Sequence, residues 1–305
     1  MTKTNIAKFC ALTAGILSLP VASYAGKDMK APKEIIEKCK ESCITGDLGV
    51  NIVSQYFSRG VLYENQGSIL QPYADLYFKL YEGEGFLNKV SLNLGWWSSF
   101  HSNHDTGFGK STGTTRSWYE TDYTFGLTFT MAKNWNVTPS YIIFASPNDA
   151  FATAQAINVK VAYDDTDLLG AFALHPYVQA LAELENKVGT GPDEGFYFEF
   201  GVAPSVPLGP VTLTFPLTLG IGTSDFYVNE KGGNESYGFF SAGAIATYPL
   251  AFVPECYGSW SLNAGYTWLT LGQGSDYIYS KTQGGTIRSN SDNEHIFQGG
   301  IIVAF

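Results

Sequence analysis

Histidine and serine side chains lie next to each other in the segment 101–104, His-Ser-Asn-His. A histidine that takes the proton of a neighbouring serine hydroxyl can create a nucleophile for hydrolysis. Consecutive residues of an extended strand point to opposite faces, which works against this hydrogen bond between His101 and Ser102. His175 and His295 have no obvious nucleophile beside them. The sequence therefore predicts no catalytic residue, and a membrane hydrolase is the least favoured interpretation.

Two carboxylates, Glu183 and Glu185, are two residues apart and would share one face of a strand. Such a pair resembles a carboxylate dyad, although solvated acidic groups explain it more simply. No set of cysteines and histidines has convincing zinc spacing, and a C-x-x-C-H haem motif is absent from the sequence. We therefore expect no metal and no cofactor.

The last eleven residues indicate which kind of element positions these groups. Alternate residues are apolar up to the final aromatic residue, Phe305, which is typical of a strand with one face in apolar surroundings. This ending resembles the closing strand of bacterial outer-membrane β-barrels. The resemblance implies that the barrel-assembly machinery would bind the strand that ends at Phe305.

The N-terminus and the charge narrow the class of protein. Residues 1–25 combine Lys3 and Lys8 with an apolar stretch and small residues before Ala25, which predicts a secretory signal peptide. Removing its two lysines changes the formal charge from −10 to −12, so binding to nucleic acid is not expected. After Ala25 no run of 18 apolar residues occurs, and a backbone can otherwise cross a bilayer only as a closed barrel.

Period-two alternation between turn residues predicts an all-β chain, a transmembrane antiparallel barrel of about twelve strands in 47–305. The external connections 102–116, 223–235 and 272–293 are long, whereas the periplasmic turns are short. Residues 26–46 would form a short periplasmic helix or a tether. The expected strands lie near 47–58, 68–82, 88–101, 117–131, 135–145, 151–163, 173–186, 193–205, 210–222, 236–248, 258–271 and 294–305.

Taking the apolar parity as the lipid-facing one leaves nine charged residues that would line the lumen. Six acids and three bases give a sum of −3, and an acidic lumen attracts cations and repels anions. The alternative is that these groups pair and fill a closed barrel. The residues are Arg59, Asp75, Lys79, Glu120, Asp122, Lys160, Glu183, Glu185 and Glu199.

Three cysteines remain after the signal peptide, namely Cys39, Cys43 and Cys256. The periplasm is oxidising, so we expect a disulfide. A bond between Cys43 and Cys256 is favoured because both lie at the periplasmic rim of the predicted barrel. A bond between Cys39 and Cys43 within one helical turn is the alternative.

Two segments carry a family resemblance. Residues 54–60, Ser-Gln-Tyr-Phe-Ser-Arg-Gly, and residues 69–77, Ile-Leu-Gln-Pro-Tyr-Ala-Asp-Leu-Tyr, are similar to the opening of the TorF-type porins. Arg59 and Gly60 match the Arg-Gly of that family, and the cysteine-containing extension departs from its pattern. The resemblance implies an outer-membrane barrel with channel activity.

These observations together predict an outer-membrane channel for the passive diffusion of small solutes, cation-preferring or for neutral polar solutes. Its partners would be outer-membrane lipid and the solutes themselves. The alternative is a closed structural or adhesion barrel that binds partners through external loops 102–116 and 272–293.

Overall fold

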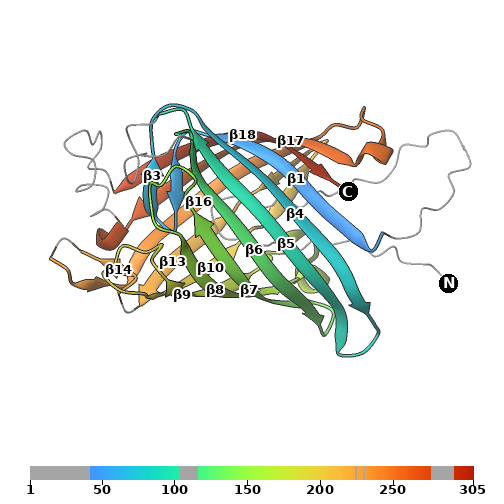
Figure 1. Cartoon of the computed structure of the whole chain (residues 1–305). Helices are drawn as coiled ribbons and strands as arrows, with labels where there is room; N and C mark the ends of the chain where they lie inside the picture. The colour runs from blue at the N-terminus through green and yellow to red at the C-terminus, as the bar shows by residue number, and fades with distance from the viewer. Residues whose placement is uncertain (1–41, 104–115, 224, 230, 276–291) are drawn as a thin grey trace, which may run out of the picture.

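The computed structural model describes residues 42–103, 116–223, 225–229, 231–275 and 292–305. Fourteen strands form one antiparallel sheet in the order β11-β12-β16-β13-β10-β9-β8-β7-β6-β5-β4-β1-β18-β17, and pairing of β16 with β17 closes it into a barrel (Figure 1). Short breaks at 203–204 and 215–216 divide two crossings into β10 with β11 and β12 with β13. The wall therefore consists of twelve crossings, and the predicted fold class is confirmed.

The strands of the wall closely follow the predicted segments. Their bounds are β1 Ile44–Val53, β4 Ile69–Glu82, β5 Leu87–His101, β6 Trp118–Met131, β7 Trp135–Ala145, β8 Ala154–Tyr163, β9 Tyr177–Glu185, β10 Phe196–Val202, β11 Ser205–Leu208, β12 Val211–Thr214, β13 Leu217–Thr223, β16 Tyr237–Pro249, β17 Ser259–Leu271 and β18 Asn293–Ala304.

The first predicted strand, 47–58, is wrong at both ends. β1 begins at Ile44 and ends at Val53, and the next residues form a separate two-stranded hairpin of β2, Tyr56–Ser58, and β3, Val61–Glu64. The turn between β2 and β3 is made by Arg59 and Gly60, whose φ angles are 51° and 77°. Two consecutive residues with positive φ reverse the chain in two-residue hairpin turns, so the strand cannot continue through them.

The two faces of the wall differ in polarity. Outward-pointing side chains such as Ile52, Phe125 and Leu262 are apolar and exposed. Inward-pointing side chains such as Asn51 and Asn263 are polar and buried, and Asn263 donates a hydrogen bond to Asn51 at 3.1 Å. This apolar exterior and polar interior are the reverse of a soluble barrel and typical of a barrel in lipid.

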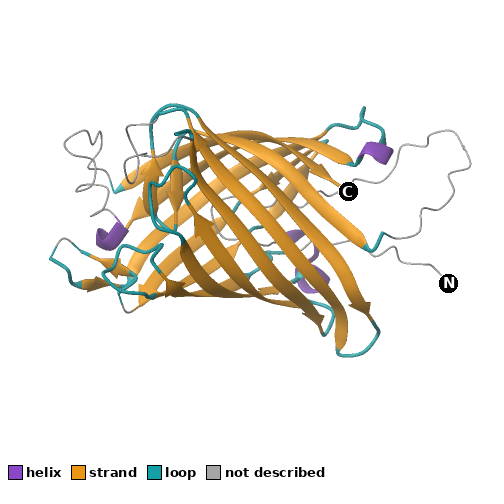
Figure 2. Cartoon of the chain, in the orientation of Figure 1, coloured by secondary structure: helices purple, strands orange, loops and turns teal. Residues whose placement is uncertain are grey.

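In the described parts of the chain, helical structure is confined to the connections between strands (Figure 2). α1 Thr166–Leu169 and η1 Gly170–Phe172 lie between β8 and β9, and η2 Glu255–Tyr257 precedes β17. Among the described residues, no helix has the length and apolar character needed to cross a membrane. A second small hairpin, β14 Tyr227–Val228 with β15 Asn234–Glu235, lies in the connection from β13 to β16.

Candidate functional site: the lumen and the hairpin across its mouth

Residues 56–64, here called the mouth hairpin, lie across the loop end of the barrel (β3 in Figure 1). All nine residues are buried. On the β1 side, Ser54 N donates to Phe297 O and Phe297 N donates to Ser54 Oγ, both at 2.9 Å. On the β4 side, Ser68 N donates to Ser102 Oγ at 2.7 Å and Ser102 N donates to Ser68 O at 3.0 Å. These reciprocal bonds fix both ends of the hairpin to the wall.

The apolar side chains of the mouth hairpin pack against inward-facing residues from around the barrel. Tyr56 stacks on Tyr63, with ring centroids 5.0 Å apart, and lies 5.3 Å from the Trp97 ring. The loop half of the lumen is therefore filled by a packed core. One part of this core contains Val53, Tyr56, Val61, Tyr63, Ile69, Trp97 and Tyr119, and the other contains Phe57, Leu62, Ile142, Phe144, Leu181, Tyr197, Phe226, Tyr227, Phe239, Leu269 and Ile296.

Arg59 lies at the tip of the mouth hairpin. Its guanidinium carbon is 4.9 Å from the centroid of the Phe144 ring and 6.0 Å from that of Tyr197. Tyr227 Oη donates to the Arg59 carbonyl at 2.7 Å, and Arg59 Nη1 donates to Ser58 Oγ at 3.0 Å. The side chain therefore enters the lumen from the tip of the hairpin rather than from the wall.

Two wall carboxylates, Glu120 and Asp122, lie beneath the mouth hairpin. Both are buried on the inward face of β6, and Tyr56 Oη donates to Glu120 Oε2 at 2.7 Å. Asp122 lies beside Glu120, and the two carboxyl side chains are within hydrogen-bonding reach of each other. Buried ionisable groups are costly unless they are paired, so this part of the core is less stable than an all-apolar one would be.

Glu183 and Glu185 point to opposite faces of the wall, contrary to the sequence analysis. The register slips between Gln155 and Ala156, so that Ala156 pairs with Glu183 but Gln155 pairs with Glu185. Glu183 is therefore buried on the inside, and Glu185 is exposed on the outside, where its carboxylate accepts a hydrogen bond from Gln155. A β-bulge reverses the side-chain alternation, and the sequence has no clear mark for it.

Glu183 serves the connection between β9 and β10. Its Oε1 accepts the N–H groups of Val188 at 2.6 Å and Gly189 at 2.8 Å, and its Oε2 accepts that of Gly195 at 2.8 Å. A carboxylate that accepts three backbone donors holds a loop firmly, because charge-assisted hydrogen bonds are stronger than neutral ones.

Towards the turn end, the lumen is lined by polar rows. Lys160, Gln179 and Glu199 are direct cross-strand neighbours on β8, β9 and β10. Lys160 Nζ lies 4.1 Å from the centroid of the Tyr177 ring, and Tyr177 Oη donates to Glu199 Oε1 at 2.7 Å. Glu199 Oε2 also accepts a hydrogen bond from Tyr197. These groups lie next to the packed core, on its side towards the turn end of the barrel.

The remaining predicted lumen residues lie on β4. Asp75 pairs directly with Asp47 of β1, so two carboxylates face the lumen side by side. Lys79 follows on the same face, and its Nζ lies 2.7 Å from Glu82 Oε2 at the turn rim. Tyr73, Asp75 and Lys79 are only half-buried, in contrast to the inward residues of the loop half.

A buried Ser–His–Glu network was missed by the sequence analysis, which considered His101 with Ser102. Ser99 Oγ lies 2.9 Å from His101 Nε2, and His101 Nδ1 lies 4.0 Å from Glu64 Oε2. The spacing Ser-x-His places both side chains on one face and could have revealed this pair. Ser99 has no exposed surface, so no substrate reaches its hydroxyl in this conformation. His101 thus lies between Ser99 of its own strand and Glu64 at the end of the mouth hairpin.

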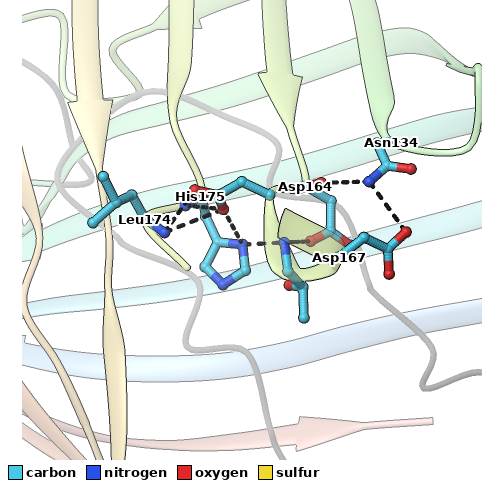
Figure 3. Close-up of polar contacts among 7 residues, drawn as sticks. Asn134, Asp164, Asp167, Leu174 and His175 are labelled. Atoms are coloured by element: carbon cyan, nitrogen blue, oxygen red, sulfur yellow. Dashed lines mark hydrogen bonds and ion pairs between the residues drawn. The ribbon is translucent and has the colours of Figure 1, made fainter. Parts of the chain in front are cut away.

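The turn between β8 and β9 gathers two acids and a histidine (Figure 3). His175 Nδ1 lies 3.8 Å from Asp164 Oδ1 and from Asp165 Oδ1, a grouping that meets the distance requirement for metal ligands. The Asp165 carboxylate, however, accepts the backbone N–H groups of Leu174 and His175, both at 2.9 Å. Burial raises the pKa of Asp165, but these donors and His175 outweigh it, and the net pKa lies below its usual value. The Asp165 carboxylate therefore stabilises the conformation of this turn.

The expected disulfide between Cys43 and Cys256 is absent, because both residues are exposed free thiols. The alternative partner, Cys39, lies outside the described residues, as do the predicted signal peptide 1–25 and most of segment 26–46. Most of the external loops 102–116 and 272–293 also lies outside them.

No protein-family model matches this chain, and no curated protein sequence is significantly similar to it. The resemblance to the TorF-type porins therefore stays a prediction. Among solved structures, an outer-membrane channel from Pseudomonas putida F1 is similar with a TM-score of 0.47 and 10% identity, covering 90% of this chain and all of that one. The NanC porin has a TM-score of 0.46 and 13% identity, covering 84% and 98%. Outer membrane phospholipase A from Escherichia coli has a TM-score of 0.42 and 13% identity, covering 85% and 89%. These three proteins resemble the chain to a similar degree, but their activities differ. A function must therefore be argued from this chain's own geometry.

Proposed function

We propose that this chain is an outer-membrane channel for the passive diffusion of small polar solutes, and that the described conformation is its closed state. The observation that carries the proposal is the reversed polarity of a closed wall of twelve crossings. An apolar exterior suits hydrocarbon, and a closed sheet pairs the backbone polar groups of neighbouring strands with one another. Polar and charged side chains in the interior do not help a barrel whose interior is merely filled, but they can solvate water and polar solutes.

We further propose that the lumen prefers cations. Glu185 points outwards and is left out of the count. The remaining predicted lumen residues are five acids and three bases, namely Asp75, Glu120, Asp122, Glu183 and Glu199 with Arg59, Lys79 and Lys160. Asp47, opposite Asp75, adds a further acid. An excess of acids in a confined space raises the local concentration of cations.

Reconstitution in planar bilayers tests both proposals. We expect discrete conductance steps and, across a KCl gradient, a reversal potential of the sign given by K⁺ permeation. Glu199→Gln should shift this potential towards zero. Glu185→Gln is the matched control, because it removes the same charge from the outer face and should leave selectivity unchanged. Anion selectivity, or equal effects of both substitutions, would contradict the proposed preference.

The packed mouth hairpin supports a second candidate, a closed structural barrel that does not conduct. Nine consecutive buried residues across the mouth are the specific observation in its favour. A barrel in which residues 55–67 are replaced by a short Gly-Ser linker separates the two functions. A channel should conduct without the hairpin, whereas conductance that stays absent from this correctly folded variant would support the structural barrel.

The end of the wall supports a role of Phe305 in assembly. β18 closes the barrel against β1, and Phe305 exchanges both backbone hydrogen bonds with Gly46 at 2.9 Å while its ring stays exposed. An exposed terminal aromatic on the closing strand is available to the barrel-assembly machinery. Phe305→Ala should lower the amount of folded barrel in outer-membrane fractions, while refolding of the purified variant in detergent should be nearly unchanged.

A further inference from the structure

The mouth hairpin is attached to the barrel in an unusual way. β2 pairs only with β3, and among the described strands neither belongs to the sheet of the wall. Its backbone contacts with the wall lie at its two ends, through Ser54 and Ser68. Between these ends and the hairpin lie Gln55 and residues 65–67, including Gly67 with a φ of 70°. The hairpin can therefore move as a unit without breaking any hydrogen bond of the wall.

The interface beneath the hairpin contains ionisable groups where a permanent plug would gain from apolar ones. Arg59 and Glu64 of the hairpin are buried, as are Glu120 and Asp122 of the wall. Replacing buried ionic groups with apolar ones of similar volume is often neutral or stabilising. Apolar packing thus favours the closed position, whereas hydration of these four side chains favours an open one.

The backbone of the hairpin tip is joined to the opposite wall by one hydrogen bond from a side chain. Tyr227 Oη donates to the Arg59 carbonyl at 2.7 Å. A Cβ atom at Gly60 would lie 2.9 Å from Ser275 Oγ and 3.1 Å from the Cβ of Phe239. Ser275 is itself fixed to the wall, because its Oγ donates to Gly238 O at 2.9 Å. The tip therefore makes a side-chain latch with the wall rather than a continued strand.

We infer that the mouth hairpin is a gate that swings out of the lumen about residues 54–55 and 65–68. In the closed position it fills the loop half of the lumen, and its tip is held by the hydrogen bond from Tyr227 and lies close to Ser275. This inference rests on the proposed channel function and adds the element that opens and closes it.

A reversible covalent latch tests the gate. The distance from Gly60 Cβ to Ser275 Oγ is close to the separation of about 3 Å between a Cβ atom and the distal sulfur of a disulfide. We would combine Gly60→Cys with Ser275→Cys in a protein in which Cys39, Cys43 and Cys256 are replaced by serine. Under reducing conditions this variant should open and close as its parent does. Oxidation should abolish the openings, and reduction should restore them.

The single variants Gly60→Cys and Ser275→Cys are the controls and should not respond to oxidation. Two further variants test the gate if Gly60, which has a positive φ, does not tolerate replacement by cysteine. Tyr227→Phe removes the bond to the Arg59 carbonyl and should raise the open probability severalfold. Arg59→Met removes the cation that faces Glu120 and Asp122, leaves these buried carboxylates without an opposite charge, and should also raise it severalfold.

The outcomes separate the gate from the channel. If the barrel without residues 55–67 does not conduct, the proposed channel function fails. If that barrel conducts but the wild type never opens, the hairpin is a permanent plug and the gate inference fails alone. The gate is also overturned if the variant with Gly60→Cys and Ser275→Cys conducts equally when its latch is oxidised and reduced, provided that mass spectrometry shows the disulfide.

Discussion

The same strands line two halves of the lumen that differ in chemistry. On β7, the inward residues near the loop end are Ile142 and Phe144, whereas Thr138 lies towards the turn end. On β8, Ala154 near the loop end gives way to Lys160 towards the turn end. The inward face thus changes from apolar to polar along a single strand. The change occurs where the lumen side of the strand stops meeting the mouth hairpin.

The comparison shows that the inward face of one barrel wall meets two different physical requirements. In the loop half the inward side chains must match a folded segment, as in the core of a soluble domain. In the turn half they must keep polar groups bonded or hydrated, as with Glu199 and its two tyrosine donors. Substitutions in the two halves should therefore have different consequences.

The largest effect is expected from Phe144→Ala in the loop half. Phe144 is 1% exposed and contacts the mouth hairpin through Arg59, so its loss leaves a cavity that the rigid wall cannot close. We expect the free energy of unfolding to fall by about 3–5 kcal/mol, measured by urea unfolding in lipid vesicles. Phe125→Ala, on the lipid-facing side, is the control and should cost clearly less. Equal losses would show that the loop half is not a core.

In the turn half, glycine and tyrosine pairs take the place of apolar packing. The Tyr177 ring lies over Gly201, its cross-strand neighbour, where a Cβ atom would overlap the ring. Gly201→Val should lower the free energy of unfolding by about 1–3 kcal/mol and displace the ring, releasing the bond from Tyr177 to Glu199. Gly299→Ala is the control, because the atom nearest to an added Cβ at this position, the Asn263 carbonyl oxygen, is 3.8 Å away. If both variants unfold at the same urea concentration, the ring does not depend on this glycine.

The sequence predicts the wall far better than its contents. Lipid on one side and lumen on the other impose a period of two on each crossing, and turn residues mark its ends, so twelve crossings could be found. The mouth hairpin could not, because its burial depends on Glu120, Phe144 and Tyr227, which are distant in sequence. One signal was present, since Val61, Leu62 and Tyr63 are apolar on both parities, which indicates a segment that is buried on both faces.

The sites show the same limit. The inward direction of Asp122 and Lys160 follows from alternation alone, whereas the outward direction of Glu185 follows from a bulge that alternation cannot reveal. The Ser99 and His101 pair needed only parity, but the sequence analysis compared the neighbouring Ser102 instead. Local spacing therefore predicts faces, and tertiary contacts decide what those faces meet.

A smaller effect is expected at the connection between β9 and β10. Glu183→Gln keeps the side-chain shape but weakens the bonds to Val188, Gly189 and Gly195. We expect a loss of about 1–2 kcal/mol and faster cleavage of the loop 187–195 by added protease. Glu185→Gln should leave cleavage nearly unchanged. A loop that is cleaved equally fast in both variants would mean that the three backbone donors are satisfied without the Glu183 charge.

The smallest effect should come from Asp165→Asn in the turn between β8 and β9, outside both halves of the lumen. The folded pKa of Asp165 lies below its unfolded value of about 3.9, so its carboxylate contributes stability that is present above that value. This contribution is lost as the pH falls through the folded pKa. The substitution should cost about 1 kcal/mol at pH 7, and the difference from the wild type should shrink as unfolding is measured at lower pH. A difference that stayed constant down to pH 3 would mean that the turn is locked by the shape of this side chain rather than by its charge, because asparagine keeps one oxygen acceptor but no charge to titrate.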